Sequence, residues 1–262
     1  MSSTQSRVME EIEVWGTIVF VECLGKSEAE LNAGISEVRE YLDFVDEVFS
    51  TYKEDSEVSR LRRGEIAISA CCGDLQEVWN LCLIAKELTE GSFDPWCVQG
   101  GFDPSGYVKG WAADKAIAIL KSQGATSIQI NAAGDLSLAG GNIVDGVLGP
   151  WKIGIRHPEE AHTVVKVFDI WDGAVATSGT YERGAHIRDP HTGLIAIGAR
   201  SASVVGPDGG LADALATALV VSGRDGAAWF AKPELAEYKA WVIDRNEDIA
   251  WEVSKDSFSN PK

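Results

Sequence analysis

Residues 127–132 read SIQINA, and similar short apolar segments follow: WKIGIR at 151–156, TVVKVFDI at 163–170, AVAT at 174–177 and ARSASVV at 199–205. Two more, AWVI at 240–243 and IAWEV at 249–253, flank an acidic turn at 244–248. Apolar residues over so few positions are typical of β-strands. Strands that come in runs, without a helix between each pair, predict an α+β fold of mixed, largely antiparallel sheets packed with helices. We find no clear linker, so we expect one domain over 1–262 with a flexible start at 1–10.

The first half of the chain predicts one strand and three helices. Residues 12–23 alternate like a strand that presents Ile12, Val14, Ile18 and Phe20 on one face. Ser27, with Glu30 three positions later, forms the pattern of a capping box. The apolar stripe of the helix that follows consists of Leu31, Ile35, Val38, Leu42, Val45 and Phe49. Further helices are expected at 74–90 and 111–122, with loops at 51–63 and 92–110.

Composition excludes several classes of protein. The formal net charge of −17 argues against a nucleic-acid binder and against docking on an anionic membrane. Residues 1–13 carry no apolar run and no segment is long enough to span a bilayer, so we expect a cytoplasmic protein. The five cysteines lack CxxC spacing, which indicates reduced thiols rather than a disulfide framework or a zinc site.

The segment LADALATAL at 211–219 has the apolar spacing of a helix. Asp213 and Thr217 lie one turn apart on it, so a carboxylate and a hydroxyl point to the same side. Such hard oxygens suit Mg²⁺, and the preceding GPDGG at 206–210 leads into a helix start that favours phosphate. Together they indicate chemistry on a phosphate ester or anhydride. The alternative is an ordinary buried helix with an acidic residue near its start.

Four loops carry the other candidate residues. Phe93 and Asp94 precede a proline, where they face a ligand or only start a turn. Lys109, at a helix start, needs an anionic partner, either a phosphate or a carboxylate such as Asp103. The turn at 131–135 most simply caps backbone groups. His186 is a candidate base oriented by Asp189, or else a hydrogen-bonded structural histidine.

Taken in order, these segments resemble the FAD:protein FMN transferase family, often called ApbE-like. The resemblance includes 15–17, 50–60, 92–95, 103–110, 131–135, 176–183, 186–193 and 212–219, which together span most of the chain. The sequence departs from the family pattern at Trp15, where the family has methionine, and at Ala133, where it has glycine. The family's Asp-Leu-Gly-Gly also reads Asp-Pro-Ser-Gly at 103–106. No Walker A loop, GxGxxG dinucleotide fingerprint, HExxH or GxSxG motif supports a different class.

The resemblance implies a role for each matching residue. The metal ligands would be the side chains of Asp213 and Thr217 with the backbone carbonyls of Gly106 and Gly210, and His186 would be the base. Contacts to FAD are implied for Trp15, Tyr52, Ser92, Phe93, Asp94, Asp103, Lys109 and Ile187. Of these, Tyr52 matches a residue near the isoalloxazine ring, and 92–94 match a loop that contacts the nucleotide part.

The resemblance therefore implies an enzyme that uses FAD and Mg²⁺ to transfer FMN to a Thr or Ser hydroxyl of an acceptor protein, releasing AMP. Two alternatives stay open at this stage. In the first, water takes the place of the acceptor hydroxyl, and the protein is an FAD pyrophosphatase. In the second, the protein binds FAD without turnover. The oligomeric state and the identity of the acceptor do not follow from the sequence.

Overall fold

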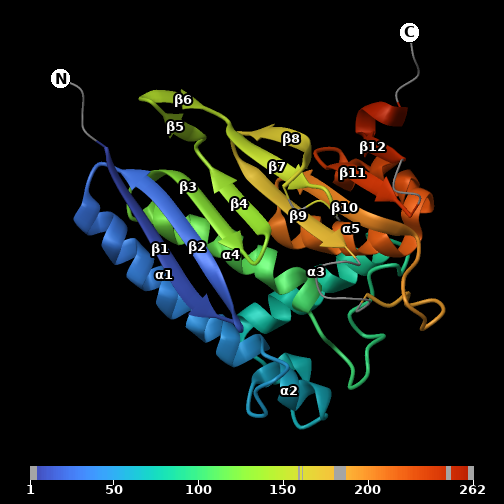
Figure 1. Ribbon diagram of the computed structural model, residues 1–262. Coiled ribbons are helices and arrows are strands. Elements are labelled where there is room, and N and C mark those ends of the chain that lie inside the picture. The colour runs from blue at the N-terminus through green and yellow to red at the C-terminus, as the bar shows by residue number, and fades with distance from the viewer. Residues whose placement is uncertain (1–4, 159, 161, 180–186, 246–248, 259–262) are drawn as a thin grey trace.

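The computed structural model describes residues 5–158, 160, 162–179, 187–245 and 249–258. Its centre is an eight-stranded sheet with the strand order β1-β2-β3-β4-β9-β10-β11-β12, in which every neighbouring pair is antiparallel (Figure 1). The strands are β1 (Ser6–Val14), β2 (Thr17–Gly25), β3 (Ala125–Ala132), β4 (Asp135–Ala139), β9 (Gly173–Gly179), β10 (Ala199–Gly206), β11 (Lys239–Asp244) and β12 (Ala250–Ser254). The predicted α+β class, with antiparallel sheets and packed helices, is confirmed.

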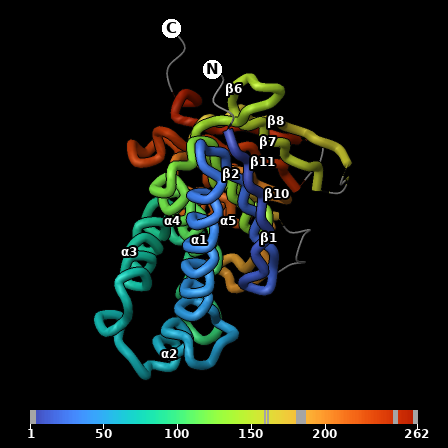
Figure 2. Tube along the Cα trace, turned by 90° about the vertical axis from the view of Figure 1, so that its left-hand side faces the viewer, coloured from blue at the N-terminus to red at the C-terminus, as the bar shows by residue number. Residues whose placement is uncertain are grey.

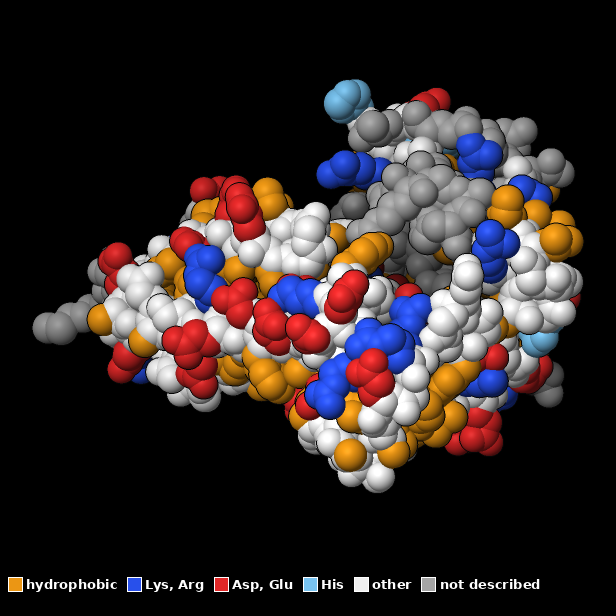
Figure 3. All heavy atoms as spheres, turned by 90° about the horizontal axis from the view of Figure 1, so that it is seen from below, with side chains coloured by type: hydrophobic (Ala, Val, Ile, Leu, Met, Phe, Trp, Pro, Cys, Tyr) orange, Lys and Arg blue, Asp and Glu red, His pale blue; other side chains and the backbone are white. Residues whose placement is uncertain are grey.

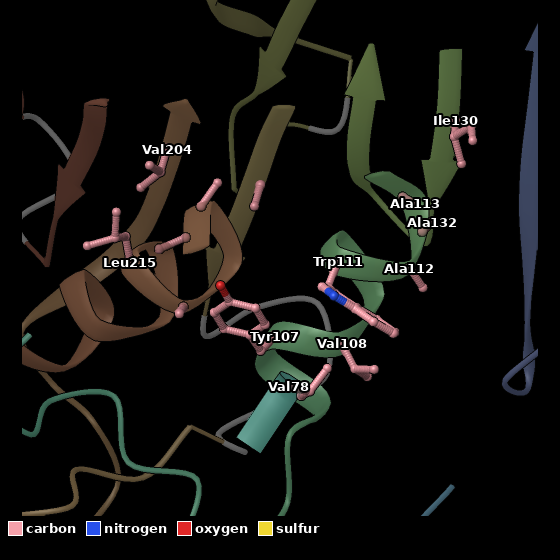
Figure 4. Packing of buried hydrophobic residues seen from close by; sticks show 14 of the residues in the cluster. Val78, Tyr107, Val108, Trp111, Ala112, Ala113, Ile130, Ala132, Val204 and Leu215 are labelled. Atoms are coloured by element: carbon pink, nitrogen blue, oxygen red, sulfur yellow. The ribbon is translucent and has the colours of Figure 1, made fainter. Parts of the chain in front are cut away.

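Helices cover one face of this sheet. They are α1 (Glu28–Phe49), α2 (Glu57–Arg62), α3 (Gly73–Leu88), α4 (Ser105–Ser122) and α5 (Gly209–Ser222), with 3₁₀ turns at Ile68–Ala70, Gly223–Ala231, Pro233–Leu235 and Lys255–Phe258. In Figure 4, Leu215 of α5 lies beside Val204 of β10, and Trp111 and Val108 extend from α4. These side chains belong to the main apolar core, so burial of the helices against the sheet is what fixes their positions.

The β7 (Trp151–Arg156) and β8 (Val164–Ile170) hairpin covers the opposite face. Figure 2 shows α3 and α4 to the left of the sheet and this hairpin to its right. Strand alternation explains the two layers, because Val205 belongs to the second core with Phe168 whereas neighbouring Val204 belongs to the first. A further small hairpin pairs β5 (Asn142–Val144) with β6 (Val147–Gly149).

The first helix forms as its sequence predicts. Ser27 is the N-cap, and its hydroxyl accepts a hydrogen bond from the Glu30 backbone N–H at 3.3 Å. Every member of the predicted apolar stripe is buried. Its periodic burial, rather than helix propensity alone, stabilises α1.

The single strand predicted at 12–23 is wrong. The chain turns at Trp15 and Gly16, whose φ values are 58° and 68°, and forms the β1–β2 hairpin. The two-residue turn changes which positions face the core: Ile12 and Val14 are buried, but Ile18 and Phe20 are exposed. Strand β1 begins at Ser6, so residues 6–10, expected in a flexible start, form part of the sheet.

Other boundaries also differ from the prediction. The expected loop at 51–63 contains α2, because Ser56 accepts from the Ser59 N–H at 3.1 Å and Val58 is buried. Helix α4 begins at Ser105 rather than at residue 111, and β4, β5 and β6 were not predicted. The earlier start of α4 matters for function, because it places Gly106 and Lys109 on a helix.

Candidate active site

A cavity of about 410 Å³ lies where α4, α5, β4, β9 and two loops meet. Its lining comes from 92–99, 103–109, 133–135, 177–179, 187–190 and α5. On the face of the molecule drawn in Figure 3, acidic and basic side chains are interspersed. The overall negative charge therefore does not exclude an anionic ligand, whose binding depends on the local arrangement of charges.

Helix α5 brings Asp213 and Thr217 to this cavity. The helix starts at an Asp208 N-cap, whose carboxylate accepts from the Leu211 N–H at 2.6 Å. Asp213 is only 4% exposed, and its carboxylate is therefore poorly hydrated. The one-turn spacing expected from the sequence thus places a carboxylate and a hydroxyl on the same cavity wall.

Lys109 links two buried carboxylates across the cavity. Its Nζ lies 2.9 Å from Asp213 Oδ2 and 3.0 Å from Asp135 Oδ2. Burial disfavours the ammonium, but the two carboxylates outweigh that effect and raise the pKa of Lys109 above its usual value. Burial, followed by the charge of Asp213, raises the pKa of Asp135 to about 6. The prediction that Asp103 is the carboxylate partner of Lys109 is wrong. The Asp103 carboxylate instead accepts hydrogen bonds from the Ser105 N–H at 3.0 Å and from the Ser105 hydroxyl.

The donor set around Asp213 fits a divalent cation. A Cβ placed on Gly106 would lie 3.8 Å from Thr217 Oγ1, which shows how close the backbone of α4 comes to this hydroxyl. Gly106 has non-helical torsion angles (φ −85°, ψ 17°), so the first turn of α4 is kinked beside the cavity. Among the described residues, no group of three or more His, Cys, Asp or Glu side chains is placed to hold a metal. A cation here would therefore rely on one carboxylate with hydroxyl and carbonyl oxygens, which are ligands that Mg²⁺ accepts.

The loop after α3 forms another part of the lining. Ser92 Oγ lies 2.7 Å from Ser222 Oγ, and the Phe93 N–H donates to Thr89 Oγ1 at 3.1 Å. The Asp94 carboxylate lies 2.7 Å from Lys86 Nζ and accepts from the Trp96 N–H at 2.9 Å. These contacts fix the loop before any ligand arrives, which lowers the entropic cost of binding.

The structure brings together most of the residues that the sequence indicates, but not all of them. Ser92, Phe93, Asp94, Asp103, Gly106, Lys109, Ile187, Asp213 and Thr217 all line the cavity. Trp15, Tyr52 and Gly210 are not among its lining residues. The Tyr52 side chain is 96% exposed, and a Cβ on Gly210 would lie 2.4 Å from a ring carbon of Tyr107. His186 lies outside the described residues.

Asp135 and Ser178 also line the cavity, although no role for either follows from the sequence. The turn at 131–135 was expected only to cap backbone groups. Asn131 does so, accepting from the Gly134 N–H at 2.8 Å, but Asp135 pairs with Lys109. Its position at the start of β4 would have been informative had that strand been predicted. Asp189 accepts from the His191 N–H and the Thr192 hydroxyl, both at 2.8 Å, and so stabilises its own turn.

The site thus combines a carboxylate and a hydroxyl, one helical turn apart, with a lysine on an antiparallel α+β fold. Residues 97–242 match the model of the ApbE family, and the chain belongs to that family.

Several relatives and solved structures are similar to this chain. An FAD:protein FMN transferase of Vibrio cholerae serotype O1 is 34% identical over 60% of this chain and 48% of its own length. One from Rhodobacter capsulatus is 37% identical over 47% of this chain and 24% of its own. The chain thus spans half or less of the length of these curated relatives.

The solved flavin transferase ApbE from Vibrio cholerae superposes with a TM-score of 0.81 at 23% identity, over 96% of this chain and 98% of that one. The ApbE protein of Thermotoga maritima gives 0.79 at 21% identity, over 98% and 100%. At these identities the likeness shows the fold. Within the described part of the chain, no helix is both long and apolar enough to cross a bilayer.

Proposed function

We propose that this protein transfers FMN from FAD to a Thr or Ser hydroxyl of an acceptor protein, with Mg²⁺ bound in the cavity. The observation that carries the proposal is the convergence of Asp213, Thr217, Gly106 and Lys109 on one cavity. Membership of the ApbE family and the curated names of the relatives support the flavin substrate. A carboxylate, a hydroxyl and an ammonium are the groups that binding of a metal–pyrophosphate requires.

Each residue has a part in the proposed reaction. Asp213, Thr217 and the backbone carbonyl of Gly106 would hold the cation, which would neutralise charge on the phosphate oxygens. Lys109 would contact the same oxygens as a second positive charge. The loop at 92–94, Asp103 and Ile187 would bind and orient FAD, whereas Trp15 and Tyr52 lie outside the cavity lining. Because the reacting groups are held in place, positioning and electrostatics account for most of the acceleration.

The transfer itself exchanges one bond for another. The acceptor hydroxyl oxygen forms a bond to the FMN phosphorus, and the bond from that phosphorus to the bridging oxygen breaks. AMP leaves with the bridging oxygen and its electron pair. His186, the proposed base, takes the proton of the attacking hydroxyl. The product is FMN joined to the acceptor through a phosphoester.

Mass spectrometry of candidate acceptor proteins tests the transfer. Each acceptor is incubated with FAD, Mg²⁺ and either the wild-type protein or Asp213→Asn, and Asp169→Asn serves as a control. Asp169 lies on β8 and forms an ion pair with Lys152, with 2.9 Å between Oδ1 and Nζ. Neither residue lines the cavity. We expect an FMN-sized addition with wild type and Asp169→Asn but not with Asp213→Asn. Release of AMP and free FMN without any acceptor adduct would instead identify an FAD pyrophosphatase, and intact FAD would indicate a binding protein.

A further inference from the structure

Lys109 forms a cluster with two carboxylates, Asp213 and Asp135. The proposed reaction assigns no role to Asp135. Its Oδ2 lies 3.0 Å from Lys109 Nζ, nearly the same distance as Asp213 Oδ2 on the other side. The side chains of Asp135 and Asp213 are 9% and 6% exposed, and that of Lys109 is 20% exposed. Two carboxylates thus share one ammonium in a poorly hydrated wall, and the cluster carries one negative charge in excess.

A cation at Asp213 would have to share this carboxylate with the ammonium of Lys109. The ammonium of Lys109 already lies on Asp213 Oδ2, so a metal ion must either displace it from that oxygen or bind Oδ1 of the same carboxylate beside it. In either case the ammonium would lie close to the metal ion. Two positive charges close together repel strongly where water is scarce. A partner that keeps the ammonium on the far side of the cluster lowers this cost.

We propose that Asp135 is the positioning residue that retains Lys109 when a divalent cation takes Asp213. Asp135 then does two things: it gives the ammonium a position away from the metal, and its charge attracts the metal to the cavity. Lys109 and the cation face a pyrophosphate from two sides. This inference rests on the proposed function, because it assumes the cation site at Asp213 and Thr217.

The surroundings of Asp135 separate this role from a structural one. Its other oxygen accepts a hydrogen bond from the Thr177 N–H at the long distance of 3.4 Å. The substitution Asp135→Asn keeps the size of the side chain and one acceptor oxygen, removes the charge and replaces the other oxygen by an NH2 donor. A purely structural role predicts that this variant weakens all binding alike. A role through Lys109 predicts that the variant binds cations more weakly and anions more tightly.

Isothermal titration calorimetry with Mg²⁺ alone, and with inorganic pyrophosphate alone, measures the two affinities. We expect Asp135→Asn to weaken Mg²⁺ binding about tenfold or more, as is typical for partners of metal-site residues. The same variant should bind pyrophosphate more tightly without metal, because Lys109 is less neutralised. Glu77→Gln is the control. Glu77 forms an ion pair with Lys115, with 2.9 Å between Oε1 and Nζ, and neither residue lines the cavity. It should match wild type in both titrations.

Lys109→Met gives a second, independent test. If the ammonium competes with the metal for Asp213, its removal should tighten Mg²⁺ binding and weaken pyrophosphate binding. Unchanged or weaker Mg²⁺ binding in Lys109→Met would overturn the proposal, as would an Asp135→Asn variant that loses affinity for both ligands or for neither. Asp213→Asn separates the two levels: normal Mg²⁺ affinity in that variant would refute the cation site itself, and with it the proposed function.

Discussion

The hydroxyl oxygens of Ser178 and Thr217 lie 3.0 Å apart, across the contact between β9 and α5. A hydroxyl that gives a lone pair to a cation still carries a hydrogen, which it must donate elsewhere. Ser178 is the acceptor placed to receive it, so we expect it to orient Thr217 towards the metal.

Ser178→Ala should therefore weaken Mg²⁺ binding by about tenfold, at the lower end of the effects seen for such partners. The fold should tolerate the change, because the hydroxyl is small and its partner also lies at the cavity. Calorimetric titration with Mg²⁺ measures the effect. Ser127→Ala is a suitable comparison, since the buried Ser127 hydroxyl donates to the Gly141 carbonyl at 2.6 Å and Ser127 does not line the cavity. Equal losses in both variants would contradict a specific role for Ser178.

The contact between α4 and α5 should be intolerant of any side chain at Gly110. A Cβ there would lie 2.2 Å from the Gly209 carbonyl oxygen, so the two helix backbones would have to move apart. We expect Gly110→Ala to lower the free energy of unfolding by about 3 kcal/mol, as overpacking does. Gly73→Ala at the start of α3 is the matched control, because its Cβ would meet nothing within 4 Å. Chemical denaturation that gives both variants wild-type stability would show that the helices are not packed as described.

A partly buried carboxylate outside the cavity, Asp114, predicts a pH dependence of stability. Asp114 accepts from the Ser137 hydroxyl at 2.6 Å and the Gly209 N–H at 2.7 Å, but burial outweighs these bonds and raises its pKa to about 6. The folded state thus binds a proton more tightly than the unfolded state, whose pKa is about 3.9. As pH rises between these two values, the unfolding free energy must fall.

Asp114→Asn removes this titration. The stability of the variant relative to wild type should therefore rise by on the order of 2 kcal/mol between pH 4 and pH 7. Urea denaturation of both proteins at the two pH values measures the difference, and the other carboxylates cancel in the comparison. A difference that stays constant, or that falls with pH, would contradict the burial assigned to Asp114.

Local signals in the sequence predicted what depends on local interactions. The Ser27 cap, the apolar stripe of α1, and the pairing of Asp213 with Thr217 on one helix face all follow from spacing along a single element. The β1–β2 hairpin did not follow, because neither Trp15 nor the positive φ that it adopts is signalled by an Asn-Gly or Asp-Gly turn. The partners of Lys109 did not follow either, since Asp135 and Asp213 come from different elements and meet only when the sheet and helices pack.

Chromatographic measurement of FAD turnover, with and without Mg²⁺, in wild type and Asp213→Ala tests the central claim most directly. Asp213 is buried at the cavity wall beside Lys109, and we propose that its carboxylate holds the cation. We expect Mg²⁺-dependent conversion of FAD by wild type, with an acceptor protein present, and loss of that conversion in Asp213→Ala while the variant remains folded. Equal, Mg²⁺-dependent turnover in the two proteins would contradict it.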